Sequence, residues 1–485
     1  MKSWMRALAD HYLQTREKYP RDRLVILFDI DGTILDTRYT VLKLLKSYDR
    51  EHGCTYFENL HLTDITFNEE DLAAELRLLE LSEQQVGHVC QWYEAHRWTS
   101  WAVFEGNKPY PGVLEVMRWF QLQPNTDVGL NSNRSESIRR QTLETLNRLG
   151  REFRIHIRDE LLVMNPDRSQ ISSGQSKING IRTITARGYR VFAMVDNEPG
   201  NLDMIAGMDN SDDILLLHAN RFFNYDRKRI SDKLVNGKVY DLTELIHRRS
   251  IPKHIQFVWQ SINNGAGMNR FLDSNVHWAD FTELVQPLIT HHRETVTTHG
   301  VSGKFANLER LFGEYLKLMK HRDRGIRLCL DYKFRDIEFI LDRIVEAGLD
   351  SKRLWFSAGI DHLDEDGFRF LADAFPGAVI ECPVDFLAQV IMTTPQTAEH
   401  LLDMYSGWGV NRFALSWRTS NIKRVSDVIE TWGFDLTIYD IRNLETFLQA
   451  VLLTPRAIVS NFNFPSWKSI NQPAGDAGVG LQSVN

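Results

Sequence analysis

Short continuous apolar runs alternate with amphipathic segments along the first half of the chain. The runs at residues 24–28, 191–195 and 214–217 contain only apolar side chains. Residues 127–134 contain a shorter apolar stretch that is followed by polar residues. Between them, apolar residues recur at the three- and four-residue spacing of a helix. Strands buried on both faces of a parallel sheet have this continuous apolar pattern. We therefore predict an α/β fold with a Rossmann-like sheet for residues 1–250.

Residues 38–108 interrupt the alternation, because they contain helical spacing and no clear strand run. We predict that this insert forms a small helical cap between the first and second strands, with an all-helical spacer as the alternative. A cap that closes over a site excludes water and strengthens the electrostatic interactions inside it. Four aromatic residues of the insert could line a specificity pocket or fill the helical core: Trp92, Trp98, Trp101 and Phe104.

The second half of the chain contains short apolar runs separated by helical segments. They fall near residues 255–259, 276–279, 326–330, 354–357, 378–380, 413–416, 436–439 and 458–460. Eight strands with intervening helices over this length predict a (β/α)8 TIM barrel for residues 251–467. Residues 468–485 are rich in Gly, Ser, Gln and Pro, so we predict a flexible tail there.

Composition and charge narrow the function classes. The 485 residues carry a formal net charge of −7, which argues against general nucleic-acid binding because such proteins present a basic surface. No run of about 18 apolar residues occurs, so we predict no membrane span. The four cysteines are scattered without metal-ligand spacing, and the first ten residues lack the pattern of a signal peptide. A cytoplasmic protein is the simplest interpretation, and the oligomeric state stays open.

Two carboxylates follow the first apolar run directly. Asp29 and Asp31 stand at its end, and Gly32 and Thr33 come next. In open α/β sheets, ligands bind beyond the carboxyl ends of the strands, where we expect both acids to lie. Two buried acids at this spacing require a metal ion or a hydrogen-bond network to compensate their charge. A turn with local hydrogen bonds from the Asp side chains is the alternative.

The pattern Asp-x-Asp-Gly-Thr resembles motif I of the haloacid dehalogenase-like (HAD) phosphohydrolases. The resemblance covers about residues 20–250 and implies that Asp29 attacks phosphorus and becomes an aspartyl-phosphate. It also implies that Asp31 protonates the leaving alcohol and then deprotonates the attacking water. The substrate expected from the resemblance is a small phosphorylated metabolite.

Later segments resemble further motifs of the same family. The predicted strand at residues 127–134 contains Ser132, whose hydroxyl the resemblance assigns to a phosphoryl oxygen, with Asn133 beside it. A predicted helix that opens at residues 172–177 carries Lys177, which would neutralise the phosphate and the nucleophile. The alternatives are an ordinary strand end for Ser132 and a surface position for Lys177.

The apolar strand that begins at residue 189 ends in Asp196, which resembles motif IV of the family. The resemblance implies a Mg²⁺ site whose protein ligands are Asp29, Asp31 through its backbone carbonyl, and Asp196. Asp196 could also cap the helix that follows. The family often carries a second acid a few residues later, and three residues compete for that place: Glu198, Asn201 and Asp203.

Parts of the second half resemble the glycerophosphodiester phosphodiesterase family. Residues 288–295, 330–333 and 457–461 are similar to its catalytic-histidine segment, its Glu-x-Lys strand end and its final strand. Two departures stand against the resemblance. The family's first strand ends in His-Arg, whereas residues 257–261 read Phe-Val-Trp-Gln-Ser, and the metal-binding Glu-x-Asp of its second strand is reduced to Asp280.

These departures favour a degenerate, non-catalytic barrel. The alternative is altered phosphodiester chemistry by residues at strand ends: His291, His292, Asp280, Asp331, Lys333 and Glu381. Three hypotheses follow for the whole chain. The first is a Mg²⁺-dependent HAD-type phosphatase. The second places phosphodiester hydrolysis or synthesis in the barrel, while the first half processes a phosphomonoester. The third is a non-catalytic ligand-binding or regulatory protein.

Overall fold

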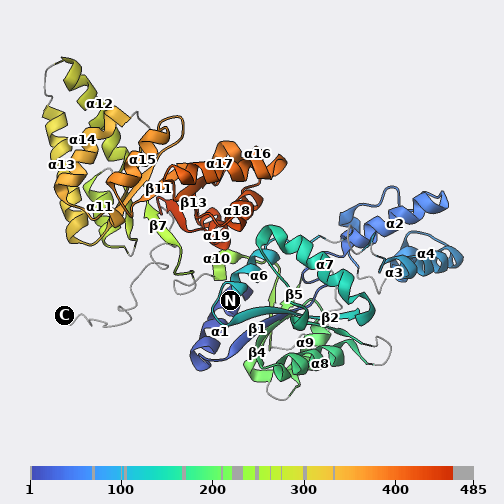
Figure 1. The fold of residues 1–485 in the computed structure, drawn as a ribbon. Coiled ribbons are helices and arrows are strands. Elements are labelled where there is room, and N and C mark those ends of the chain that lie inside the picture. Colours follow the sequence, from blue (N-terminus) through green and yellow to red (C-terminus); the bar gives the residue numbers. More distant parts are fainter. Residues whose placement is uncertain are drawn as a thin grey trace, which may run out of the picture. The chain divides into compact units, whose positions relative to one another are not determined.

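The computed structural model divides the chain into two compact units, residues 1–246 and 247–485 (Figure 1). The residues that it describes are 3–67, 72–99, 101–102, 106, 108–166, 171–208, 211–220, 233–245, 251–260, 262, 264–274, 276–298, 303–330 and 334–462. The predicted tail at residues 468–485 and Phe104 lie outside these ranges. Each unit is built around parallel strands.

The first unit is organised around a six-stranded parallel sheet. Its strand order is β3-β2-β1-β4-β5-β6, so β1 lies between β2 and β4. The strands are β1 (Arg23–Phe28), β2 (Thr126–Ser135), β3 (Leu162–Asn165), β4 (Tyr189–Asp196), β5 (Leu215–Ala219) and β6 (Leu234–Gly237). The sequence analysis does not predict β3, although Leu162, Val163 and Met164 are apolar, nor β6, in which two apolar residues are followed by Asn and Gly.

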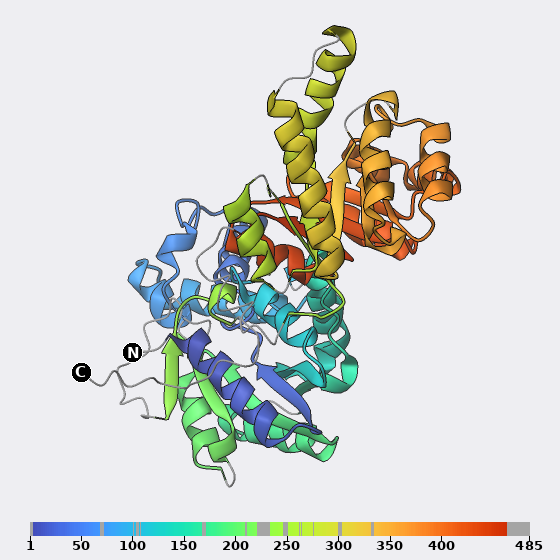
Figure 2. The ribbon, with the colours of Figure 1, turned by 90° about the vertical axis from the view of Figure 1, so that its left-hand side faces the viewer.

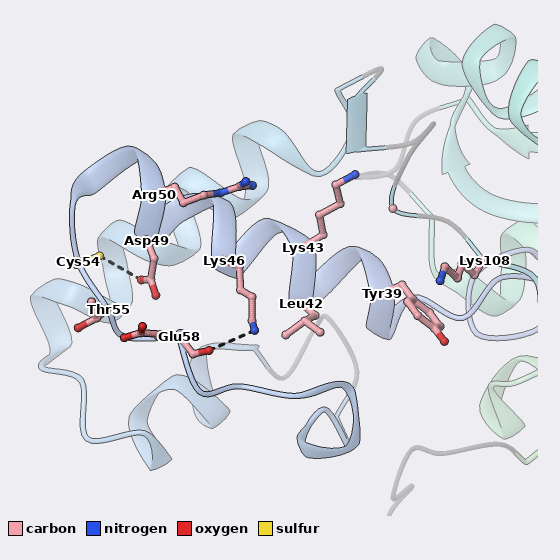
Figure 3. A pocket seen from close by; sticks show the side chains of 11 residues that line it. Tyr39, Leu42, Lys43, Lys46, Asp49, Arg50, Cys54, Thr55, Glu58 and Lys108 are labelled. Carbon is pink, nitrogen blue, oxygen red and sulfur yellow. Dashed lines mark hydrogen bonds between the residues drawn. The ribbon is translucent and has the colours of Figure 1, made fainter.

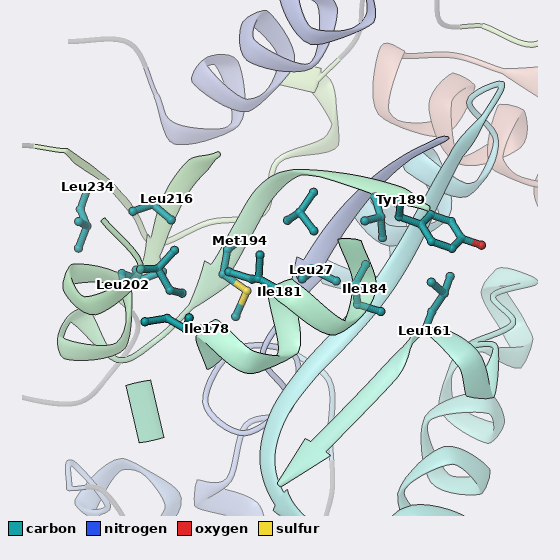
Figure 4. Packing of buried hydrophobic residues seen from close by; sticks show 13 residues of the cluster. Leu27, Leu161, Ile178, Ile181, Ile184, Tyr189, Met194, Leu202, Leu216 and Leu234 are labelled. Carbon is teal, nitrogen blue, oxygen red and sulfur yellow. The ribbon is translucent and has the colours of Figure 1, made fainter. Parts of the chain in front are cut away.

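Two helices, α8 (Ser173–Ala186) and α9 (Pro199–Ala206), cover one face of the sheet. Figure 4 shows apolar side chains of α8 packed against those of the strands. The buried cluster contains Val25, Leu27, Leu161, Ile178, Ile181, Ile184, Tyr189, Val191, Met194, Leu202, Ile205, Leu216 and Leu234. Burial of a side chain of this size contributes about 1.5–3 kcal/mol, so this layer holds α8 firmly against the strands.

The opposite face of the sheet is covered by α1 (Trp4–Lys18) and α6 (Val113–Gln121). Tyr12 and Phe120 contact the ring of Phe192 in β4, with ring centroids 5.3 and 5.7 Å away. Because successive side chains of a strand point to opposite faces, the part of a strand that is covered on both sides is apolar at every position, as residues 191–195 of β4 are. Two further helices complete the core of this unit: α7 (Arg139–Gly150) and α10 (Leu242–Leu245).

The described part of the insert between β1 and β2 contains helices and no strand, as predicted, and we refer to it as the cap. Its helices are α2 (Arg38–His52), α3 (Leu72–Leu78) and α4 (Glu83–His96). They enclose an apolar core of their own, and Trp92 packs against it. A bridge between Leu35 and Pro109 joins the two chain segments at the base of the cap.

The second unit contains eight parallel strands that close into a barrel. The strands are β7 (Gln256–Trp259), β8 (Trp278–Asp280), β9 (Gly325–Cys329), β10 (Leu354–Ser357), β11 (Val379–Pro383), β12 (Arg412–Ser416), β13 (Leu436–Ile441) and β14 (Ala457–Ser460). β14 pairs with β7 and closes the cylinder. Each strand overlaps one of the predicted apolar runs. The predicted fold class, a parallel α/β sheet joined to a TIM-like barrel, is therefore confirmed.

Helices alternate with the strands of the barrel. They are α11 (Gly265–Leu272), α12 (Thr282–Thr298), α13 (Gly303–His321), α14 (Phe334–Ala347), α15 (Glu365–Ala374), α16 (Ala388–Thr393), α17 (Pro395–Gly407), α18 (Ile422–Thr431) and α19 (Leu444–Leu452). Figure 2 shows α12 and α13 as two long helices that lie side by side. His291 and His292 lie within α12 and not at a strand end, which differs from the prediction. The reason is the helical spacing of Leu284, Leu288 and their neighbours, which carries the helix on from β8.

Large side chains fill the inside of the barrel. Trp278 and Trp355 are buried and meet edge to face, with ring centroids 5.3 Å apart. Gly325 makes room for them, because a Cβ at this position would lie 2.5 Å from the Trp278 ring. The barrel is therefore a packed core and not an open pore.

In the described part of the chain, no helix is both long and apolar enough to cross a membrane. The cysteines Cys54, Cys90, Cys329 and Cys382 are free thiols. Burial raises the pKa of Cys329 to about 11, so this thiol stays protonated near neutral pH and is a poor nucleophile.

Candidate active site

Three neighbouring strands of the first unit carry polar side chains at one edge of the sheet. Asp29 follows β1, Asp196 ends β4, and Ser132 lies near the end of β2. Because β1 pairs with β2 on one side and with β4 on the other, the three residues lie at the same edge. The strand order reverses at β1, since the chain passes outward to β3 before it returns as β4. Ligands of open α/β sheets bind at such a reversal.

Lys177 joins the two buried acids. Its Nζ donates hydrogen bonds to Asp29 Oδ1 and, at 2.6 Å, to the backbone carbonyl of Asn131. The same Nζ lies 3.2 Å from Asp196 Oδ2. Asp29 is 7% exposed, and Lys177 and Asp196 are fully buried. The structure thus brings together three residues that are far apart in the sequence, and one positive charge faces two carboxylates.

Burial and charge both act on the protonation of this cluster. Burial raises the pKa of Asp29 to about 7, while Lys177 opposes the rise and Asp196 and Asp31 add to it. For Lys177, burial alone would lower the pKa, but Asp196 and Asp29 outweigh it and raise the pKa above its usual value. The lysine is therefore charged. The cluster retains an excess of negative charge that a second cation would relieve.

Gly32 shapes the loop that follows β1. Its φ of +74° lies in the left-handed region, which glycine adopts without steric cost. A Cβ at this position would also lie 2.5 Å from Asn197 Nδ2, so a side chain does not fit. Thr33 Oγ1 donates to Asn197 Oδ1 at 3.4 Å. The loop that carries Asp31 is thereby held against the end of β4.

Asp31 is bound by Arg134, a residue that the sequence analysis does not single out. Arg134 donates from Nε to Asp31 Oδ2 at 2.7 Å and from Nη2 to Asp31 Oδ1 at 2.6 Å. This is the bidentate geometry in which arginine binds carboxylates most strongly. The sequence signal for Arg134 is a basic residue two positions after Ser132. That signal alone does not separate a functional arginine from a surface one.

Ser132 and Asn133 have different surroundings. Ser132 is buried, and its Oγ accepts a hydrogen bond from the backbone N–H of Arg134 at 3.2 Å. A hydroxyl that accepts one bond still carries a proton that it can donate to a phosphoryl oxygen. Asn133 Nδ2 instead donates to Ser173 Oγ at the start of α8, so Asn133 links β2 to that helix.

Glu198, Asn201 and Asp203 are the three candidates for the second residue of the metal motif. Of their side chains, that of Asn201 contacts Asp196. Its Nδ2 lies 3.4 Å from each Asp196 carboxylate oxygen, and its Oδ1 accepts from Ser173 Oγ at 2.7 Å. Glu198 reaches Asp196 Oδ1 through its backbone N–H at 2.8 Å. The cap position of α9 is Glu198, so Asp196 is not the helix cap that the sequence offers as an alternative.

The oxygen donors at this edge fit a hard divalent cation. Asp29 and Asp196 both lie against Lys177 Nζ, and the backbone carbonyl of Asp31 belongs to the same loop. Mg²⁺ is commonly bound by one or two carboxylates and completes its shell with water and substrate phosphate. Within the described residues, no three His, Cys, Asp or Glu side chains converge on one point. The Asp31 side chain does not join the other two acids, because Arg134 binds it.

The cap contains a pocket of about 680 Å³ along α2 (Figure 3). Lys43, Lys46 and Arg50 follow one another along this helix, and Lys108 lies at the base of the cap. The pocket is partly built by Asp49, whose carboxylate accepts hydrogen bonds from the loop that begins at Cys54. None of these residues was predicted to form a site, because basic residues on a helix usually mark a solvated face.

The residues predicted for a barrel site divide into two groups. Asp280 and Glu381 are buried, and each binds Arg327 at 2.6 Å. Burial works against the charge of Arg327, but Cys329, Glu381 and Asp280 raise its pKa well above the usual value. Both acids are therefore bound by the same guanidinium within the barrel, which compensates part of their charge. Two of the remaining candidates, Asp331 and Lys333, lie outside the described residues. For His291 and His292 the structure describes the backbone and not the side chain.

A comparison with protein families matches part of the first unit. Residues 26–171 match the family model for haloacid dehalogenase-like hydrolases. The matched range begins within β1 and contains Asp29, Asp31, the cap and Ser132. Residues 26–171 of the first unit therefore resemble a haloacid dehalogenase-like hydrolase domain. The barrel lies outside the match.

Solved structures give further likenesses. One is a protein from Clostridium difficile that is described as a phosphatase and is 16% identical to this chain in sequence. The two structures have a TM-score of 0.33, and the likeness covers 47% of this chain and 100% of that one. A HAD-superfamily hydrolase of subfamily IA, variant 1, from Geobacter sulfurreducens is 13% identical, with a TM-score of 0.30 and coverage of 42% and 89%. No curated protein matches the chain.

Proposed function

We propose that the first unit is a Mg²⁺-dependent phosphatase that hydrolyses a small phosphomonoester through an aspartyl-phosphate on Asp29. The observation that carries the proposal is the buried cluster in which Lys177 contacts both Asp29 and Asp196. A carboxylate nucleophile needs fixed positive charge beside it, because the phosphoryl group that it attacks is itself anionic. The match of residues 26–171 to haloacid dehalogenase-like hydrolases supports the same chemistry.

The two acids of the first loop have separate roles in this proposal. Asp29 attacks phosphorus, the bond from phosphorus to the alcohol oxygen breaks, and Asp31 gives that oxygen a proton. Asp31 then takes a proton from a water molecule, which attacks the aspartyl-phosphate and releases inorganic phosphate. Lys177 and Ser132 stabilise the charge on the transferring group, where most of the catalysis of phosphoryl transfer lies.

The residues that would hold Mg²⁺ are Asp29, Asp196 and the backbone carbonyl of Asp31, with Asn201 beside them. When bound, the ion neutralises phosphate charge and favours the ionised form of Asp29. This second effect matters because burial raises the pKa of Asp29 to about 7, and only the ionised carboxylate attacks.

A panel of small phosphate esters, assayed with Mg²⁺ and with EDTA, tests this proposal. We expect phosphate release that falls by at least about 100-fold when the metal is removed, because a metal ion stabilises the transition state by several kcal/mol. Addition of excess Mg²⁺ to the chelated protein restores the rate. Equal rates with and without the chelator would contradict the role of the metal, and no hydrolysis of any ester would contradict the function.

The barrel has a second candidate function, the phosphodiester chemistry implied by its resemblance to glycerophosphodiester phosphodiesterases. The contacts of Arg327 favour a non-catalytic barrel instead, because they occupy both Asp280 and Glu381. We expect no hydrolysis of bis(4-nitrophenyl) phosphate by the intact chain with Mg²⁺ or Ca²⁺. Diester hydrolysis that Asp29→Asn retains and His292→Ala loses would contradict this expectation and place the main chemistry in the barrel.

A non-catalytic role for the whole chain is the third candidate. It predicts that an Asp29→Asn, Asp31→Asn double variant keeps full function in the cell. The buried contact between Lys177 and two acids argues against it, because such a cluster is costly to desolvate and needs a compensating use.

A further inference from the structure

The Arg134 guanidinium is held in place from several directions. Its Nη1 donates to Thr142 Oγ1 at 3.2 Å, and the ring of Trp98 lies 5.3 Å from its Cζ. Its Nε and Nη2 bind the two oxygens of Asp31. The Arg134 side chain is 2% exposed, whereas that of Asp31 is 32% exposed. The arginine is therefore the fixed member of the pair, and Asp31 is the member that can move away.

This pairing conflicts with the proposed role of Asp31 in the reaction. A group that passes a proton to the leaving alcohol must place an oxygen against the ester oxygen, but both Asp31 oxygens accept bonds from Arg134. Bidentate, charge-assisted bonds are among the strongest in proteins, so Asp31 leaves only when another oxyanion replaces it. The carboxylate of Asp31 itself shows that a planar carboxylate fits the arginine.

We propose that Arg134 binds a carboxylate of the substrate, which displaces Asp31 and frees both of its oxygens for the reaction. The substrate class is then a phosphorylated hydroxy acid. This inference rests on the proposed phosphatase function and adds a substrate class to it. Arg134 is two residues from Ser132 on the same strand end, so one small molecule can place its phosphate near Ser132 and its carboxylate at Arg134.

Trp98 links this contact to the cap. It follows α4, and the Cζ of Arg97 lies 5.0 Å from its ring. The ring therefore lies close to a guanidinium of the cap and to that of Arg134 in the core. An aromatic ring beside a buried cation keeps water away from it, which strengthens its interaction with an oxyanion.

Matched pairs of esters test the inference. They are 3-phosphoglycerate with glycerol 3-phosphate, and phosphoglycolate with 2-hydroxyethyl phosphate, and each pair differs in one carboxylate. We expect the intact chain to prefer the carboxylate in kcat/KM by about 10- to 150-fold, the range of a charge-assisted hydrogen bond. Arg134→Met abolishes the preference, chiefly through KM. Arg134→Lys keeps the charge without the two-pronged geometry and retains a smaller preference.

Two results would overturn the inference: no preference in the intact chain, or the same preference in the intact chain and in Arg134→Met. Should the methionine variant fail to fold, the ratio measured with Arg134→Lys decides, since an unchanged ratio there also overturns it. A purely structural arginine would change the rates on both members of a pair together and leave their ratio unchanged.

A binding experiment separates failure of the inference from failure of the proposed function. Asp29→Asn lacks the nucleophile, so calorimetric titration with Mg²⁺ present measures affinity without turnover. We expect 3-phosphoglycerate to bind at least about 10-fold more tightly than glycerol 3-phosphate, and Arg134→Met in the same background to remove the difference. Equal affinities in Asp29→Asn would overturn the inference even if esters are hydrolysed. The phosphatase function fails on a different result, the absence of hydrolysis of every ester.

Discussion

Replacement of Asp29 by Asn is expected to abolish phosphate release from every ester that the intact chain hydrolyses. The amide has no anionic oxygen to attack phosphorus, so no aspartyl-phosphate forms. Loss of one stabilising donor alone costs about 10²–10³-fold in kcat, so loss of the nucleophile should cost at least about 10³-fold. Steady-state phosphate release measures the effect. Mass spectrometry of acid-quenched protein shows whether the peptide that contains Asp29 carries a phosphoryl group.

The control for this substitution is Asp22→Asn. Asp22 lies just before the opposite end of β1, where it pairs with Arg190 at 2.6 Å, and it is part of no proposed site. We expect normal phosphate release from this variant. Asparagine has nearly the size of aspartate, so the buried cluster around Lys177 should keep its packing. Activity of Asp29→Asn above about one tenth of the intact chain would exclude Asp29 as the nucleophile.

The strands of both units were predictable because continuous apolar runs mark strands that are buried on both faces. The run at residues 24–28 becomes the centre of the sheet, and the barrel strands coincide with short runs of the same kind. β6 was not predictable, because only two of its four residues are apolar, whereas the apolar residues of β3 give a signal that the sequence analysis does not use. His291 and His292 were placed by a family resemblance at a strand end, although the apolar spacing around them is helical.

The candidate site was predictable to the extent that its residues stand in local patterns. Asp29 and Asp196 end apolar runs, and Lys177 lies in the first turns of a helix that such a run follows, so each carries a signal within its own segment. The local signal of Arg134, a basic residue two positions after Ser132, does not single it out, because its importance depends on Asp31, which is 103 positions away in the sequence. Arg327 is similar. Only the closed barrel shows that Asp280 and Glu381 meet it.

Replacement of Arg327 by Met is expected to destabilise the second unit by about 3–5 kcal/mol, because it removes the cation that faces two buried carboxylates. Arg327 and Asp280 are almost fully buried, and Glu381 is completely buried. Repulsion between the acids and their desolvation then act together. Hydrogen exchange of the amides in β8, β9 and β11, followed with increasing urea, measures the loss. It also assigns the loss to the barrel, which a single unfolding curve of a two-unit chain would not do.

Two variants separate the buried charge from a general effect of losing an arginine. Arg369→Met removes an exposed helix pair with Glu365, which contributes less than about 1 kcal/mol, so its exchange should be close to that of the intact chain. Addition of Asp280→Asn and Glu381→Gln to Arg327→Met removes the unpaired charges and should recover much of the stability. If Arg327→Met is no less stable than Arg369→Met, the contacts of Arg327 with Asp280 and Glu381 do not stabilise the barrel. Its acids would then be free to act as ligands, and the case for a non-catalytic barrel would lose its main support.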